Sequence, residues 1–114
     1  MRDNAEKLRD IMEAIARIER YAFESRKSFE GNELLQTWFL YNLQVIGEAS
    51  RALSAEFREQ HPEIPWTEII GMRNILVHNY FEVDLDIVWF AIQRNVPQLK
   101  SQVEAILQNM GETY

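Results

Sequence analysis

The sequence predicts an all-α fold, an up-and-down bundle of four or five helices. Apolar residues recur at the three-and-four spacing of amphipathic helices over most of the 114 residues. No segment alternates between apolar and polar residues for long enough to predict a β-strand. Prolines and glycines interrupt the helical pattern at separate points and divide it into elements. This length suits a single domain, and we expect it to extend over residues 1–114.

The first predicted helix runs from about Asn4 to Arg26. Asp3 and Glu6 have the spacing of a capping box at its start. Residues 24–31 are expected to form a turn, with Gly31 as its helix terminator. The apolar face of this helix consists of Leu8, Ile11, Met12, Ile15, Ile18 and Ala22.

The second predicted helix runs from Asn32, a favourable N-cap residue, to about Gln60. Its apolar residues cover more than one face, which indicates contact with two neighbours, or with one neighbour and a partner chain. Gly47 within this helix costs about 1 kcal/mol of helix propensity. We therefore expect another helix to approach closely at that position. The apolar residues are Leu34, Leu35, Trp38, Phe39, Tyr41, Val45, Ile46, Ala49, Leu53 and Phe57.

The segment after the second helix holds two prolines three positions apart, which cannot lie within a helix interior. A third helix is predicted from Pro65 or Trp66 to about Tyr80. Asp84 is expected to cap a fourth helix. Pro97 either kinks that helix or starts a fifth.

The composition excludes several classes of function. The chain has no cysteine, which removes disulfides, thiolate zinc sites and cysteine nucleophiles. Its formal charge of −6 argues against non-specific nucleic-acid binding, so any such role must come from a local site. No apolar stretch is long enough to span a membrane, and no signal peptide is evident. We expect a cytoplasmic protein with no membrane partner, metal or cofactor.

One short run holds the residues best suited to chemistry. On an ideal helix, Arg73 falls in the middle of an apolar arc, with Tyr80 about 20° away. His78 lies about 140° from Arg73 and shares an edge with Asn74, four residues earlier. A buried guanidinium needs compensation for its lost hydration. Arg73 therefore either pairs with a carboxylate, for which Glu48 is a candidate, or faces an interface or cleft.

Spacing alone leaves a structural and a catalytic interpretation open. In the structural one, Arg73 forms an ion pair with Glu48, and His78 is a cap or a surface group. In the catalytic one, a two-fold axis brings Arg73, Asn74 and His78 of two copies around one cleft. Histidine can act as general acid or base, and arginine can bind phosphate and stabilise developing charge. With an RNA 2′-hydroxyl as the nucleophile, such a site needs no metal.

The chain resembles the HepT-like branch of the HEPN superfamily, a group of small bacterial and archaeal proteins. The run Arg73-x4-His78-x-Tyr80 matches the R-x4-H-x-Y motif of that family, with Asn74 directly after the arginine. The resemblance covers about residues 35–100. Three further segments resemble the family in the same order, namely 46–49, 62–66 and 83–89.

The resemblance implies a HEPN-like homodimer that acts as a toxin with metal-independent endoribonuclease activity. Arg73 and His78 would be the catalytic pair in a cleft between the two copies, with Asn74 as a supporting polar group. The usual partner is a minimal nucleotidyltransferase antitoxin, which can transfer AMP from ATP onto the motif tyrosine, here Tyr80. The alternative is a non-catalytic helical dimer that binds the nucleotidyltransferase, in which Arg73 and Glu48 stabilise the fold.

Overall fold

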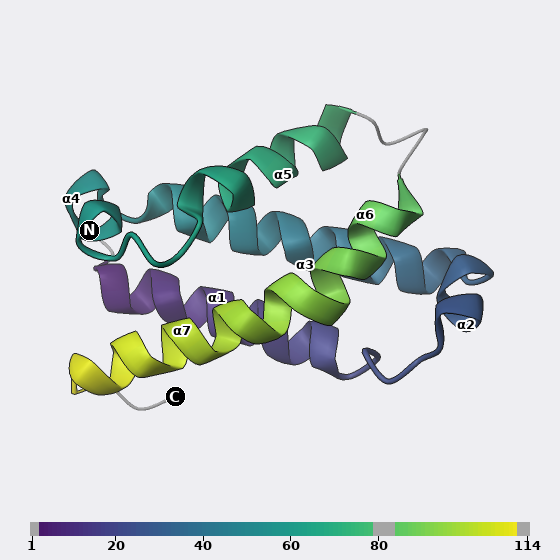
Figure 1. Ribbon diagram of the computed structural model, residues 1–114, viewed down its shortest axis with the longest axis horizontal. Helices are drawn as coiled ribbons and strands as arrows, with labels where there is room; N and C mark the ends of the chain where they lie inside the picture. Colours follow the sequence, from purple (N-terminus) through teal and green to yellow (C-terminus); the bar gives the residue numbers. More distant parts are fainter. Residues whose placement is uncertain (1–2, 79–83, 112–114) are drawn as a thin grey trace.

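The protein is helical throughout the residues that the structure, a computed structural model, describes, namely 3–78 and 84–111 (Figure 1). Within residues 73–78 only the backbone is described. No strand occurs in these ranges, so the predicted all-α class is confirmed. The elements are α1 (Asn4–Glu19), α2 (Arg26–Glu30), α3 (Glu33–Ala52), α4 (Ala55–Gln60), α5 (Trp66–His78), α6 (Leu85–Phe90), a π-helical turn (Ala91–Asn95) and α7 (Val96–Asn109).

Helix α3 is the central element of the bundle. It packs most extensively against α1 and α5, and it also contacts α2 and α6. Helix α5 runs antiparallel to α3, while the continuous α6–α7 segment crosses in front of both α1 and α3 in the view of Figure 1. Helix α7 contacts α1 as well. The long second helix of the sequence pattern therefore has more than one neighbour, as its broad apolar surface predicts.

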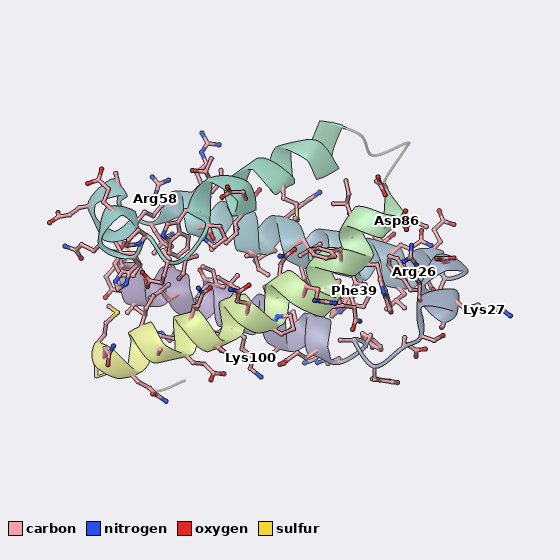
Figure 2. All side chains as sticks on the ribbon, viewed as in Figure 1. Arg26, Lys27, Phe39, Arg58, Asp86 and Lys100 are labelled. Carbon is pink, nitrogen blue, oxygen red and sulfur yellow. The ribbon has the colours of Figure 1, made fainter. Side chains whose placement is uncertain are left out.

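The predicted apolar face of the first helix forms one side of the core. Leu8, Ile11, Ile15 and Ile18 are all fully buried. Removing such a side chain from water contributes about 1.5–3 kcal/mol each. Phe39 of α3 continues this core and lies at the centre of the molecule in Figure 2.

The three predicted helix starts are confirmed by hydrogen bonds from side chains to backbone. Asp3 accepts from the Glu6 amide at 2.9 Å, and Asn32 accepts from the Leu35 amide at 3.0 Å. Asp84 accepts from two amides at the start of α6, at 2.9 and 3.3 Å. Each bond satisfies a backbone N–H that has no partner within the helix.

Two predicted helix boundaries are wrong. The first helix ends at Glu19 rather than near residue 26, and the expected turn over residues 24–31 contains the short helix α2. The second helix does not continue to Gln60, because it ends at Ala52 and α4 begins after Ser54. The Ser54 hydroxyl accepts from the Phe57 amide at 3.1 Å, which starts a new helix instead of extending the old one.

Pro97 lies in one uninterrupted helical segment that starts at Leu85. A π-helical turn precedes the proline, and in it the Val96 amide donates to the Ala91 carbonyl oxygen, five residues earlier. Proline has no N–H, and its ring would clash with the carbonyl four residues before it in a regular α-helix. The wider turn accommodates the proline within a continuous helix.

Candidate active site on helix α5

The start of α5 is anchored to two other helices. The Trp66 indole Nε1 donates to the His61 carbonyl oxygen at 3.0 Å, just beyond α4. Gln102 of α7 donates through Nε2 to the Glu63 carbonyl oxygen at 2.9 Å. Ile64 and Trp66 are both buried. The proline-containing segment therefore fixes where α5 leaves the bundle.

Helix α5 then lies along α3, with Ile69 and Met72 partly buried against the core. A cavity of about 120 Å³ lies between α5, α3 and α7. Leu43 and Ile46 of α3 line it together with Ile69 and Met72, and polar residues from α5 and the α6–α7 segment complete it. Those polar residues are Glu68, Asn95, Gln98 and Gln102. The sequence pattern does not reveal this cavity, because its shape depends on how the helix axes cross.

Arg73, Asn74 and His78 all lie in the C-terminal half of α5, so the predicted helical placement of these residues is confirmed. At 1.5 Å per residue, Arg73 and His78 are about 7.5 Å apart along the helix axis and about 140° apart around it. Their side chains lie outside the described part of the structure, as does all of Tyr80. That the side chains of Arg73, Asn74 and His78 meet in one cleft stays a prediction.

Glu48 is exposed on α3 and lines a groove between α1 and α3. Lys7 and Arg17 of α1 line the same groove. Pairing of Glu48 with Arg73 stays a prediction.

Helix α6, which follows the motif in the sequence, is anchored to α2. Arg26 of α2 forms an ion pair with Asp86 in the first turn of α6, and Figure 2 shows these two side chains meeting. The rings of Phe29 and Trp89 lie 5.3 Å apart between their centroids, which joins the same two helices. Helix α6 is thus held at its start by the Asp84 cap and the ion pair, and near its end by the aromatic contact.

The described part of the chain shows neither a cluster of side chains that could hold a metal ion nor a helix that could span a membrane. Among the residues whose side chains are described, 3–72 and 84–111, no group of three or more histidine, aspartate or glutamate side chains could hold a metal ion. No described helix is both long enough and apolar enough to cross a membrane.

Comparison with known proteins identifies the family. The sequence profile described as Ribonuclease HepT-like matches residues 11–106, which include the whole of α5. The chain belongs to the HepT-like family. The resemblance stated from the motif is thereby confirmed, and it places the chain in the class of HEPN-type ribonucleases.

Several relatives have names that agree with this family. The chain is 44% identical over 91 residues to a protein of Caldanaerobacter subterraneus subsp. tengcongensis named as a putative RNase, covering 80% of this chain and 81% of the relative. It is 37% identical over 106 residues to the "Probable ribonuclease HepT" of Thermococcus cleftensis, covering 92% and 96%. A Methanocaldococcus jannaschii protein, also named as a putative RNase, is 40% identical over 78 residues, covering 68% and 72%. No solved structure matches the chain.

Proposed function

We propose that this protein is a metal-independent endoribonuclease whose site is completed by two copies of the chain. The observation that carries the proposal is the family match, which includes the helix holding Arg73 and His78. We also propose that residues 1–114 form one domain, since the match to the Thermococcus relative covers nearly all of both chains.

The proposed reaction uses the substrate's own 2′-hydroxyl as the nucleophile. His78 accepts the proton of that hydroxyl, and the 2′-oxygen attacks the adjacent phosphorus. The bond between phosphorus and the 5′-oxygen breaks, and the leaving oxygen takes up a proton. The products are a 2′,3′-cyclic phosphate and a 5′-hydroxyl. Arg73 stabilises the negative charge that develops on the phosphoryl oxygens, and Asn74 supports it as a hydrogen-bonding group.

The spread of the motif around α5 supports a homodimer. Arg73 and His78 are about 140° apart on one helix, so a single copy presents them in different directions. Two copies of α5 related by a two-fold axis would place an arginine from one copy near a histidine from the other. The proposed cleft therefore lies between the copies.

We further propose that the protein is the toxin of a toxin–antitoxin pair in the cytoplasm, with a minimal nucleotidyltransferase as its partner. The Tyr80 hydroxyl would attack the α-phosphorus of ATP, forming adenylyl-tyrosine and releasing pyrophosphate. The new phosphodiester brings one negative charge, two residues after His78. It would repel the RNA backbone and silence the site.

Expression in cells without any partner tests this function. Wild type, His78→Ala and His61→Ala are induced separately, while growth and the integrity of total RNA are followed. His61 is the chain's other histidine and lies 3.3 Å from Glu63 through Nδ1, which makes it a matched control. Growth arrest with discrete RNA cleavage is expected in the wild type and in His61→Ala only. Intact RNA in all three strains, with folded protein present, would favour the non-catalytic binding module.

A further inference from the structure

The cavity between α5, α3 and the α6–α7 segment, which we call the α5 cavity, has the size of one planar ring. Its volume is about 120 Å³. For comparison, an apolar cavity of ~150 Å³ holds one benzene molecule. A single aromatic ring therefore suits the α5 cavity, whereas two fused rings exceed it. Its walls are apolar side chains from three helices, namely Leu43, Ile46, Ile69, Met72 and Leu99.

Polar side chains form the mouth of the α5 cavity. Glu68, Asn95 and Gln98 line it and are exposed, so the cavity opens to solvent beside them. Gln102 also lines it and donates through Nε2 to the Glu63 carbonyl oxygen at 2.9 Å. This bond leaves Oε1 of Gln102 as the atom that can accept from a ligand. The mouth therefore offers two acceptors, the Glu68 carboxylate and Gln102 Oε1, and two amides that can donate.

One wall of the α5 cavity is the π-helical turn that interrupts the α6–α7 segment. Ala91 and Asn95, the first and last residues of this turn, both line the cavity. Turns of this kind are rare and occur frequently at functional sites. The turn supplies a small residue, which leaves room for a ring, and an amide at the mouth.

An unpaired cytosine base matches both the volume and the mouth of the α5 cavity. Cytosine has one ring, and its exocyclic amino group donates hydrogen bonds, which a glutamate carboxylate is suited to accept. Uracil also has one ring, but it carries an acceptor oxygen in place of the amino group, and that oxygen would face the Glu68 carboxylate. Adenine and guanine each have two rings and are too large for the cavity.

The segments that border the α5 cavity are poor in acidic residues, although the chain has a formal charge of −6. Residues 87–103, along α6 and α7, contain no aspartate or glutamate and include the exposed Arg94. Residues 69–81 contain none either and include Arg73. Among the described residues that line the cavity, Glu68 is the only acidic one. An RNA backbone can therefore approach here with little repulsion between like charges.

We propose that the α5 cavity binds a cytosine base of the RNA, in a nucleotide next to the bond that is cleaved. This inference rests on the proposed ribonuclease function and assigns its sequence preference. Met72 lines the cavity, and Arg73 follows it directly in the helix. A base held in the cavity thus keeps its neighbouring phosphate close to the helix turn that carries Arg73. Single-stranded RNA allows this mode of recognition, because its bases can leave the stack.

The base preference of cleavage tests this assignment. Purified protein cleaves a pool of random single-stranded RNA, and sequencing of the new ends gives the bases on both sides of each cut. Matched RNAs that differ only at the preferred position are then cleaved separately. The wild type should cleave the cytosine RNA at least ~10-fold faster than the uracil or adenine RNA, since one good contact to a base edge discriminates by about that factor.

Substitutions at the cavity should change this preference. Glu68→Gln keeps the shape of the side chain, but its amide can also donate to the uracil oxygen, so the preference for cytosine over uracil should fall to within ~3-fold. Glu59→Gln, at an exposed position on α4 outside the cavity, is the matched control and should keep the full preference. Ala91→Leu fills part of the cavity and should remove the preference for cytosine. The ratio of rates on two RNAs does not change when a variant is merely less stable, and circular dichroism checks folding.

A binding experiment gives a readout that does not depend on cleavage. Wild type and Glu68→Gln are titrated with short fluorescent oligocytidylate and oligouridylate whose 2′-hydroxyls are methylated, so that the nucleophile is blocked. Fluorescence anisotropy measures the two dissociation constants. The wild type should bind the cytosine strand more tightly, and Glu68→Gln should bind both strands about equally.

The outcomes separate this inference from the proposed function. Preferential binding of oligocytidylate that is lost in Glu68→Gln supports the base site, even if no RNA is cleaved and the proposed function is wrong. Cleavage with no preference for cytosine, or with a preference that Glu68→Gln leaves unchanged, overturns the base site and leaves the ribonuclease standing. Neither cleavage nor preferential binding overturns both. Preferential binding of cytidine monophosphate without any preference in RNA would assign the cavity to a free nucleotide and overturn the inference.

Discussion

Asn4 and Ser54, fifty positions apart, form two hydrogen bonds that join the start of α1 to the break between α3 and α4. The Asn4 side-chain amide donates to the Ser54 hydroxyl at 3.3 Å, and the Ser54 backbone amide donates to Asn4 Oδ1 at 3.2 Å. Ser54 also caps α4 through the Phe57 amide. One serine thus starts α4 and joins the break between α3 and α4 to the start of α1.

Ser54→Ala should therefore destabilise the fold. The loss of an N-cap costs about 1 kcal/mol, and for a domain of this size that lowers the melting temperature by about 4 °C. Thermal unfolding followed by circular dichroism measures the change. Ser101→Ala, at an exposed position within α7, is the control and should change the melting temperature by less than about 1 °C. Equal effects of the two substitutions would show that the Ser54 hydroxyl contributes nothing to stability.

The anchor of α5 makes a second prediction. Trp66→Phe keeps an aromatic ring in the core but removes the Nε1 donor, which leaves the His61 carbonyl oxygen without that bond. Loss of such a bond costs about 1–2 kcal/mol. Amide hydrogen exchange of α5 should become faster relative to that of α1, since the bond holds the start of α5 locally. Exchange that speeds up equally in both helices would contradict a local anchor.

The proposed chemistry makes a third prediction about the RNA. Cleavage products should carry a 2′,3′-cyclic phosphate and a 5′-hydroxyl, which mass spectrometry can identify. A single 2′-deoxy nucleotide on the 5′ side of the cleaved bond should abolish cutting there, because it removes the nucleophile. Cleavage of the deoxy-substituted strand at the same bond would exclude the proposed mechanism.

Tyr80 should be the position that accepts AMP. Incubation with the nucleotidyltransferase and ATP should add AMP to the wild type, and Tyr80→Phe should stay unmodified. RNA cleavage by unmodified Tyr80→Phe should stay within a few-fold of wild type, because the proposed reaction does not use the phenol. Tyr41→Phe is the control, since it removes a phenol hydroxyl outside the motif, and it should still accept AMP. Modification of Tyr80→Phe to the wild-type extent would place the acceptor elsewhere.

The sequence predicts helix starts better than helix ends. Asp3, Asn32 and Asp84 cap their helices through atoms two or three residues away, so the signal is local. The break before Ser54 was missed because Leu53 and Phe57 continue the helical spacing of apolar residues. The hydrogen bonds between Ser54 and Asn4 join residues fifty positions apart, and the periodicity of apolar residues cannot show such a contact.

For the candidate site, too, the sequence predicts local features and misses those that depend on how the helices pack. The motif on α5 is a pattern of residue types at fixed spacing, and both the helix and the family that it predicts are confirmed. The exposure of apolar residues on α3 was not predicted, because the sequence alone does not show which apolar residues stay uncovered. Leu34 and Phe39 belong to the same apolar set, yet Leu34 is 84% exposed and Phe39 is fully buried.

The central claim is that His78 performs the chemistry, and RNA cleavage by purified protein tests it most directly. Wild type, His78→Ala and His61→Ala are compared on one labelled RNA in the presence of a metal chelator. Loss of a general acid–base group typically costs about 10²–10⁴-fold in rate. We expect His78→Ala to be at least ~100-fold slower, while His61→Ala stays within a few-fold of wild type and all three melt at similar temperatures. Cleavage by His78→Ala at the wild-type rate would contradict the account.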